Sequence, residues 1–367
     1  MKKILCLIDR LGFGGAERQL IGLALLLKQK GYDAEVATYH DFNFDTNALV
    51  KNGIKLNRIS QKSNPFTKLL AVKRLVNQQK YDVVIAYKSG GTMLACLLKM
   101  LGGTFKLIVS ERNTTQALSR KERLKFWLYR YADYIVPNSY TQEAFIKRHY
   151  PILSNKTFTI TNFTDTDHFC TADKESNSIF VILTTARIAR QKNVLAYLEA
   201  VRLVKDKKLN ARFRWLGNVQ TGEEEYGRKC KECITTLGIA DVFEFHPAKS
   251  DILSEYQLCD IFCLPSLYEG YPNVICEAMS CGKPVVCSRV CDNPYIVEEG
   301  KNGLLFDPLS VEDMAEKIAV MIRMKSEDRM AWGKCNRERA IEKFSTETFV
   351  KKYVKLIDRN EENELQK

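Results

Sequence analysis

The chain has 367 residues, of which 45% are hydrophobic and 27% charged, a balance typical of a folded globular protein rather than a disordered one. This length exceeds what a single core usually supports, so it predicts two domains. The net charge is +12, and the basic excess lies in the first half: residues 1–170 carry 26 Lys and Arg against 13 Asp and Glu, whereas residues 171–367 carry 30 against 31. A lysine-rich solvated surface and contact with an anionic membrane both fit this asymmetry. Nucleic acid is disfavoured, because no zinc-finger spacing, RNP-like aromatic motif or basic zipper occurs.

The apolar segments are too short for a secretory leader or a membrane span. The run after Met1 covers only Ile4–Ile8 and ends at Asp9. No segment approaches the ~18 apolar residues that cross a bilayer. The 12 cysteines are scattered through apolar segments, which is typical of buried thiols in a reducing compartment. We therefore expect a cytoplasmic protein in which any membrane contact is peripheral.

In the first half, short apolar runs alternate with amphipathic helical stretches. The expected strands are Lys3–Ile8, Ala34–Thr38, Val83–Tyr87, Leu107–Ser110 and Tyr134–Val136. The expected helices are Glu17–Lys30, Phe66–Gln79, Gly91–Leu101 and Lys121–Ala132. Such alternation predicts parallel strands joined by right-handed crossovers, and therefore a Rossmann-like sheet.

The second half repeats this rhythm after a polar, aperiodic stretch over residues 162–178, which is typical of a linker. The expected strands are Ile179–Ala186, Phe213–Leu216, Phe243–Phe245, Ile261–Leu264, Pro284–Cys287 and Leu304–Phe306. The expected helices are Asn193–Val204, Glu223–Leu237, Ser250–Leu258, Asn273–Ser280, Pro294–Glu298 and Val311–Met324. The fold class expected is α/β, with two Rossmann-like domains, 1–165 and 166–345, facing across a cleft. Site residues are expected in the loops that follow the strands.

The loop after the expected strand Ile261–Leu264 is the most informative segment. Glu269 and Glu277 stand eight residues apart, on either side of Gly270–Asn273. Pro272 suits the first turn of a helix, and the N–H groups at a helix N-terminus bind phosphate or hydroxyl groups. A carboxylate one turn into that helix can accept both hydroxyl protons of a ribose diol, and one in the loop can reach a transferred sugar. Two solvated surface carboxylates are the competing interpretation.

Two cations, Arg187 and Lys192, follow the expected strand Ile179–Ala186. Fixed cations in a cleft stabilise negative charge that develops in a transition state. The alternative is an ordinary pair of surface cations near the start of a helix.

The first strand is followed by Gly14 and Gly15, which precede a helix. Such a loop brings backbone N–H groups close to a ligand. A dehydrogenase fingerprint does not fit, because position 17 is Glu rather than a third Gly and no acid ends the strand Ala34–Thr38.

The stretch from Tyr268 to Val286 resembles the E-x7-E signature of GT-B glycosyltransferases, in particular the large retaining glycosyltransferase family 4. Further segments resemble motifs of that family in the family's order, and together they cover nearly the whole chain. These are the glycine loop at Gly14–Arg18, the interdomain motif at Asn162–Phe169, the Arg…Lys pair at Arg187 and Lys192, and the Asn-Gly-Leu-Leu motif at Asn302–Phe306.

The resemblance implies roles for these residues. Glu277 would bind the nucleotide ribose, whereas Glu269, Arg187 and Lys192 would be the catalytic residues, the first on the donor sugar and the two cations on the diphosphate. The other residues expected to bind the donor are Gly270, Tyr271, Pro272, Asn273, Gly14 and Gly15.

The chain departs from the family pattern where a histidine often lies near the donor sugar. Residues 109–115 contain none. Glu111, Arg112 and Asn113 follow a strand there, so they are acceptor-side candidates that could line the cleft. Surface loop residues are an equally good interpretation of these three.

The resemblance implies a retaining transferase that moves a sugar from a nucleoside-diphosphate sugar to a glycan acceptor, lipid-linked, in cell-surface polysaccharide or glycolipid synthesis. No cofactor or metal is expected, because Asp165-Thr-Asp167, which looks like a metal-binding pair, falls inside the interdomain motif. A helix over about 346–360 is expected to pack back on the first domain. The alternatives are a GT-B epimerase or phosphorylase, and a non-catalytic nucleotide- or glycan-binding homologue.

Residues 120–130 mix basic and aromatic side chains at helical spacing. Such a helix would either lie on anionic lipid with Phe126, Trp127 and Tyr129 at the interface, or pack its aromatics on the sheet and leave its cations in water. The segment alone favours packing, but the charge of the whole first half favours contact with the inner face of the plasma membrane.

Overall fold

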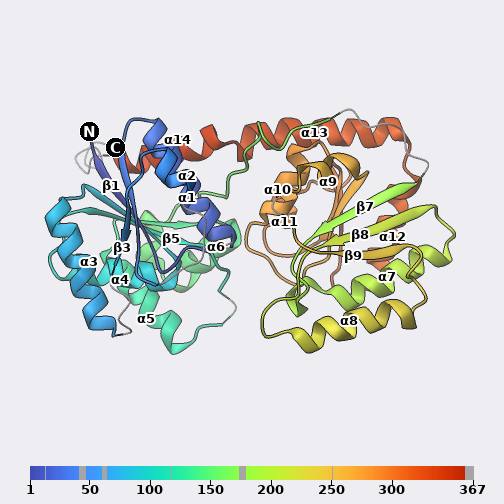
Figure 1. Cartoon of the computed structure of the whole chain (residues 1–367), viewed down its shortest axis with the longest axis horizontal. Helices are drawn as coiled ribbons and strands as arrows, with labels where there is room; N and C mark the ends of the chain where they lie inside the picture. The colour runs from blue at the N-terminus through green and yellow to red at the C-terminus, as the bar shows by residue number, and fades with distance from the viewer. Residues whose placement is uncertain are drawn as a thin grey trace. The chain divides into compact units, whose positions relative to one another are not determined.

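The structure, a computed structural model, describes residues 1–12, 14–40, 47–59, 64–115, 117–172, 179–249 and 251–359. Residues 173–178 of the expected linker and Ser250 of an expected helix lie outside the described residues. The chain forms two units: unit 1 holds residues 1–162 and the chain from Thr346 onward, and unit 2 holds residues 163–345. Each unit is a six-stranded parallel sheet flanked by helices (Figure 1). The predicted class, α/β with two Rossmann-like domains, is confirmed.

Unit 1 has the strand order β3-β2-β1-β4-β5-β6. Its strands are β1 (Lys3–Ile8), β2 (Asp33–Thr38), β3 (Leu56–Arg58), β4 (Val83–Tyr87), β5 (Lys106–Glu111) and β6 (Tyr134–Pro137). Its helices are α1 (Gly15–Gln29), α2 (Asn47–Lys51), α3 (Pro65–Gln79), α4 (Lys88–Met100), α5 (Arg120–Leu128), α6 (Tyr140–His149) and α14 (Thr346–Asp358), with 3-10 turns η1 (Tyr129–Tyr131) and η2 (Pro151–Lys156).

Unit 2 has the strand order β12-β11-β10-β7-β8-β9. Its strands are β7 (Phe180–Thr185), β8 (Ala211–Leu216), β9 (Phe243–His246), β10 (Ile261–Leu264), β11 (Val285–Ser288) and β12 (Gly303–Phe306). Its helices are α7 (Val194–Asp206), α8 (Glu224–Thr236), α9 (Leu253–Leu258), α10 (Asn273–Ser280), α11 (Asn293–Ile296), α12 (Val311–Arg323) and α13 (Ser326–Phe344), with the 3-10 turn η3 (Arg190–Lys192).

Both sheets are built from continuous apolar runs because helices cover both of their faces. All residues of β4 and of β10 are buried. The strand order reverses direction between β1 and β4 in unit 1 and between β7 and β10 in unit 2. Ligands of open α/β sheets bind outside the carboxyl ends of the strands at such a switch point, so the loops after these four strands are where the site is expected.

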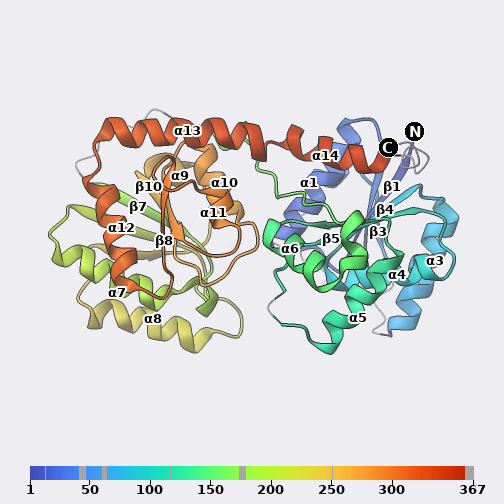
Figure 2. The same ribbon diagram turned by 180° about the vertical axis from the view of Figure 1, so that it is seen from behind.

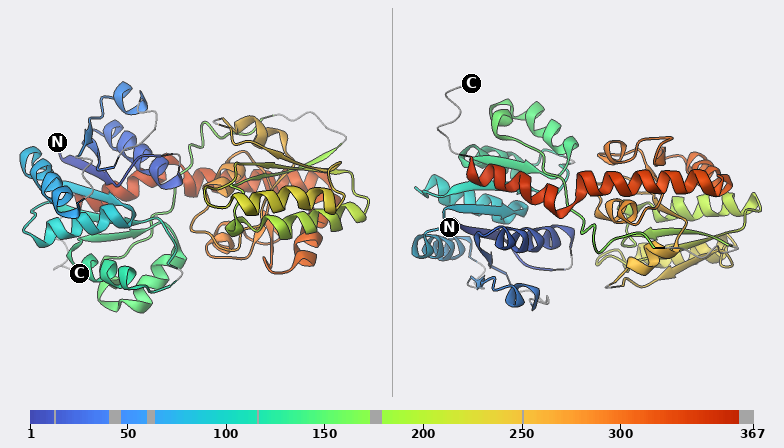
Figure 3. Two further views of the ribbon diagram at one scale, coloured as in Figure 1. Left: turned by 60° about the horizontal axis from the view of Figure 1, so that its bottom comes forward. Right: turned by 90° about the horizontal axis from the view of Figure 1, so that it is seen from above.

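Helix α14 returns to unit 1 and contacts α1 (Figure 2). The Lys2 and Lys106 ammonium groups donate to the carbonyl of Ile357 at 3.1 and 3.0 Å, which ties its last turn to the sheet. Helix α13 packs along α10 in unit 2 (Figure 3). Among the described residues, no helix is both long and apolar enough to cross a membrane.

Candidate active site

The switch point of unit 2 brings together two of the three residues expected to be catalytic. Lys192 lies in η3, after β7, and Glu269 lies in the loop after β10. The Lys192 ammonium donates to Oε1 of Glu269, and the Ser266 hydroxyl donates to the same oxygen at 2.6 Å. Glu269 is 8% exposed, so its charge is balanced by an ammonium and a hydroxyl and only slightly by water. No motif pointed to Ser266, because its contact with Glu269 depends on how the loop folds back.

Backbone contacts hold these two segments against each other. The Leu267 N–H donates to the carbonyl of Gln191 at 2.8 Å, and the Gln191 side-chain amide donates to the carbonyl of Tyr268 at 2.9 Å. Asn193 follows η3 with a φ of +55°. That left-handed conformation is one that glycine and, among the other residues, asparagine adopt most readily, so Asn193 suits this turn.

Glu277 lies in the second turn of α10 and is 2% exposed. The Tyr256 hydroxyl donates to its Oε2 at 2.9 Å and lies 3.0 Å from the hydroxyl of Thr185, the last residue of β7. Burial, together with the neighbouring Glu277 charge, raises the pKa of Tyr256 well above its ordinary value. Tyr256 therefore stays protonated and orients the Glu277 carboxylate. Tyr256 stands on α9, and no motif singled it out.

The N-terminus of α10 lies between the two carboxylates. The helix begins at Asn273, as expected, and Pro272 is its N-cap residue rather than a residue of its first turn. Tyr271 is 7% exposed and packs edge-on against Phe344 at 5.9 Å between ring centroids. Gly270 is half-buried. The N-terminus of α10, with its partial positive charge, therefore follows Glu269 and precedes Glu277 along the chain.

Arg187 follows β7 and is exposed. Its backbone is fixed by the next strand: a Cβ on Gly217 would lie 1.9 Å from the carbonyl oxygen of Ala186, so only glycine allows this approach. Among the described residues, no hydrogen bond or ion pair engages the Arg187 guanidinium. The third expected catalytic residue is thus held at the switch point by its backbone, while its side chain is open to solvent.

The glycines expected to bind the donor belong to unit 1. Gly14 is the N-cap residue of α1 and Gly15 its first residue, after the end of β1, and both are exposed. They therefore lie at the switch point of the first sheet, whereas the other predicted donor contacts lie in unit 2.

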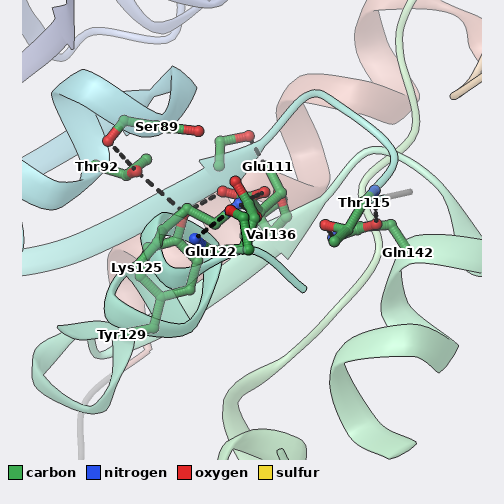
Figure 4. A network of polar contacts seen from close by, with 11 residues as sticks. Ser89, Thr92, Glu111, Thr115, Glu122, Lys125, Tyr129, Val136 and Gln142 are labelled. Carbon is green, nitrogen blue, oxygen red and sulfur yellow. Dashed lines mark hydrogen bonds and ion pairs between the residues drawn. The ribbon is translucent and has the colours of Figure 1, made fainter. Parts of the chain in front are cut away.

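Glu111, an acceptor-side candidate, is engaged inside unit 1 (Figure 4). It is 2% exposed, and its carboxylate accepts from the Lys125 ammonium at 2.8 Å and from the Tyr129 hydroxyl. Burial lowers the pKa of Lys125, but the Glu111 and Glu122 carboxylates more than offset this, and the pKa is raised. Glu111 therefore anchors α5 to the end of β5.

Arg112 is likewise committed to a buried network. Its guanidinium donates to Asn162 at 2.9 Å, to the hydroxyl of Tyr353 on α14 at 2.7 Å and to the hydroxyl of Tyr87. Asn113, the third acceptor-side candidate, is the one of the three whose side chain is exposed.

Asp165 of the interdomain motif closes its own turn. Its carboxylate accepts from the backbone N–H groups of Asp167 and His168 at 3.2 and 3.1 Å. Within the described part of the chain, no group of three or more His, Cys, Asp or Glu is arranged to hold a metal ion.

Comparisons with known proteins agree with this architecture. Residues 13–168 match Glycosyltransferase Family 4, and residues 171–339 match Glycosyl transferases group 1. The chain is 25% identical over 334 residues to an uncharacterized glycosyltransferase of Haemophilus influenzae, covering 88% of this chain and 91% of that one.

Two further relatives are informative. The chain is 24% identical over 342 residues to the GalNAc-alpha-(1->4)-GalNAc-alpha-(1->3)-diNAcBac-PP-undecaprenol alpha-1,4-N-acetyl-D-galactosaminyltransferase of Campylobacter jejuni, covering 88% of this chain and 89% of that one. The crystal structure of Anabaena Alr3699/HepE in complex with UDP is similar with a TM-score of 0.83 and 23% identity, over 97% of this chain and 99% of that one.

Two Rossmann-like units, each built on a six-stranded parallel sheet, form the architecture shared with that solved structure, the GT-B fold. The two sequence matches, one to each half, show that the chain is a GT-B enzyme of the glycosyltransferase family 4 type.

Proposed function

We propose that this enzyme transfers a sugar from a nucleoside-diphosphate sugar to a lipid-linked glycan acceptor, with retention of the anomeric configuration, in cell-surface polysaccharide or glycolipid synthesis. The observation that carries the proposal is the Lys192–Glu269 contact at the ends of β7 and β10, beside the helix that bears Glu277. The UDP bound to the Anabaena structure and the undecaprenol diphosphate in the name of the Campylobacter relative support this donor and acceptor.

The leaving group accounts for the cations of the site. As the bond between sugar and diphosphate breaks, negative charge grows on the nucleoside diphosphate. Lys192 and the N-terminus of α10 would then stabilise that charge from fixed positions, and the solvent-exposed guanidinium of Arg187 would add its own positive charge. Lys192, which would bind the phosphate, is paired with Glu269, which would bind the sugar. One contact therefore positions both side chains.

Glu269 would act by orienting the sugar. Its Oε1 accepts two hydrogen bonds, which reduces the nucleophilicity of that oxygen and suits a carboxylate that also accepts from a sugar hydroxyl. Retention then follows either from front-face attack, with the departing phosphate oxygen as base, or from a double displacement. Glu277 would hold the ribose, with Tyr256 fixing its orientation.

The same cations make the proposed transfer independent of a metal ion. A divalent ion in other transferases neutralises the diphosphate, and here Arg187 and Lys192 would supply that charge. We propose that transfer continues unchanged in the presence of EDTA.

Contact with the membrane belongs to the same proposal. A lipid-linked acceptor has its diphosphate at the membrane surface, and the basic first half would be attracted to the anionic inner leaflet. Exposed Trp127 and Leu124 on α5 supply the apolar contact, and Asn113 is the acceptor-side candidate that remains accessible.

A donor screen tests the proposal. The purified enzyme is incubated with each common nucleotide sugar, with and without undecaprenyl-diphosphate glycans and with and without EDTA, and products are identified by mass spectrometry. We expect a glycan one sugar heavier and release of the nucleoside diphosphate from one donor class. Conversion of the nucleotide sugar without an acceptor would indicate an epimerase instead, and binding without turnover a non-catalytic homologue.

A further inference from the structure

The switch point of unit 1 contains an ion pair, Glu17 with Lys88, that the proposed mechanism does not use. The glycine loop, defined here as Gly12, Gly14 and Gly15, follows β1, and Lys88 follows β4, the neighbouring strand. Phe13 of this loop lies outside the described residues. Because β1 and β4 flank the point where the strand order reverses, both loops lie where ligands of such sheets bind.

The Glu17 carboxylate lies directly against the glycine loop. Glu17 is the third residue of α1 and is 6% exposed. A Cβ built on Gly14 would lie 2.5 Å from its Oε2, and one built on Gly12 would lie 3.6 Å from its Oε1. A carboxylate at the third helical position commonly folds back over the N-cap residue in this way. Gly14 has no side chain to cap α1, so Glu17 is the side chain that shapes this turn.

Lys88 supplies the counter-charge. Its ammonium lies 2.5 Å from Oε1 of Glu17 and 3.8 Å from Oδ1 of Asp9, at the end of β1. The backbone of Lys88 has a φ of +61°, in the left-handed region that lysine seldom adopts. This conformation begins α4 directly at the end of β4, and the ion pair with Glu17 offsets its cost.

We infer that Glu17 and Lys88 are a positioning pair that holds the glycine loop in the shape that receives the donor diphosphate. The inference rests on the proposed function, in which Gly14 and Gly15 present their N–H groups to that diphosphate. Glycine has the largest conformational freedom of any residue, so a loop of glycines needs an external contact to keep one shape. Without a counter-charge, the Glu17 carboxylate beside the loop would repel the diphosphate. The Lys88 ammonium neutralises that carboxylate and so removes the repulsion.

Substitutions of this pair, with UDP as the probe, test the inference. Glu17→Gln, Lys88→Met, the double variant and Lys88→Arg are compared by calorimetric UDP binding, by donor and acceptor KM, and by Tm. We expect Glu17→Gln and Lys88→Met each to weaken UDP binding and raise the donor KM about tenfold, the loss typical for a charged group without its hydrogen-bond partner. The double variant should be no worse than either single one, because the pair acts as a unit. Lys88→Arg should restore binding to within about twofold of wild type.

The controls are Glu225→Gln and Lys229→Met, an exposed pair 2.8 Å apart on α8, which should change neither measurement. A lower Tm with unchanged UDP affinity and donor KM in the two single variants would overturn the inference, as would additive losses in the double variant. Failure of the proposed function is distinguishable. A wild type that binds UDP and transfers no sugar contradicts the function, while the UDP affinities of the variants still decide the role of the pair.

Discussion

The two carboxylates of the donor site differ in what holds them. Glu269 is held by a cation and a hydroxyl, so its charge is neutralised where the sugar is expected. Glu277 accepts from the Tyr256 hydroxyl, a neutral donor, so its negative charge is not paired with a cation by that contact. This difference suits one carboxylate for the sugar and the other for a ribose diol.

Replacing Glu277 by alanine should therefore weaken donor binding. Two hydroxyl hydrogen bonds to a charged group are lost, so we expect the donor KM to rise about ten- to a hundredfold, with a smaller change in kcat. Steady-state kinetics with the donor found in the screen measure this. Glu312→Ala on α12 removes an exposed carboxylate and is the matched control. Unchanged donor kinetics in Glu277→Ala would contradict the assigned role.

The positions of the proposed donor-site residues in the fold could be predicted better than their contacts. Arg187, Lys192, Glu269 and Glu277 all follow strands of the second half, which a strand pattern reveals. The partners of Glu111 and Arg112 could not be found in this way. Tyr353 lies 241 residues beyond Arg112 in the chain. Lys125, the partner of Glu111, lies on a helix whose buried face the sequence pattern did not determine. Both candidates proved to be buried in contacts within unit 1.

Helix α5 resolves the two interpretations of its aromatic and basic residues. Phe126 and Tyr129 are buried at 1% and 0% exposure, whereas Leu124 and Trp127 are exposed at 49% and 42%. Lys125 holds the helix in this orientation through Glu111 (Figure 4). The exposed basic residues on or next to this helix are Arg120, Lys121, Arg123 and Arg130. The buried face packs, and the exposed face combines apolar and basic side chains, which is the combination that the proposed contact with anionic lipid requires.

The double variant Leu124→Ser/Trp127→Ser should therefore weaken binding to anionic liposomes. Burial of each side chain contributes about 1.5–3 kcal/mol, so even partial insertion predicts at least a roughly tenfold lower bound fraction in flotation at low salt. Leu309→Ser in unit 2 removes a side chain that is 83% exposed and serves as the matched control. Wild-type protein that does not float with anionic liposomes, or a variant that floats as well as wild type, would count against this contact.

The sequence pattern predicted the elements that have strong hydrophobic periodicity. Strand β3 and helix α13, which it missed, lack such periodicity. Strand β3 has three residues, none of them buried, so no apolar run marks it. Helix α13 is largely polar and buries only four of its 19 residues, Gly333, Asn336, Ala340 and Phe344. Its contact with α10 arises from tertiary packing, as Gly333 lies against the backbone of Gly282.

At the scale of the whole molecule, the alternation of strands and helices was sufficient to predict two parallel sheets, because parallel strands require crossovers. The two halves that form these sheets also differ in charge, because the excess of cations lies in the first half. The proposed glycosyltransferase with a lipid-linked acceptor would use this division, with the donor bound by the carboxylates of unit 2 and the basic first half at the membrane.

The most direct test of the central claim is the structure of the transferred product. With an α-linked nucleotide sugar as donor and an undecaprenyl-diphosphate glycan as acceptor, the product is analysed by NMR for its new anomeric proton. We predict transfer with an α linkage, and loss of that signal when the donor is omitted. A β-linked product would contradict retention, and the absence of any new glycosidic bond with every donor would contradict the transferase itself.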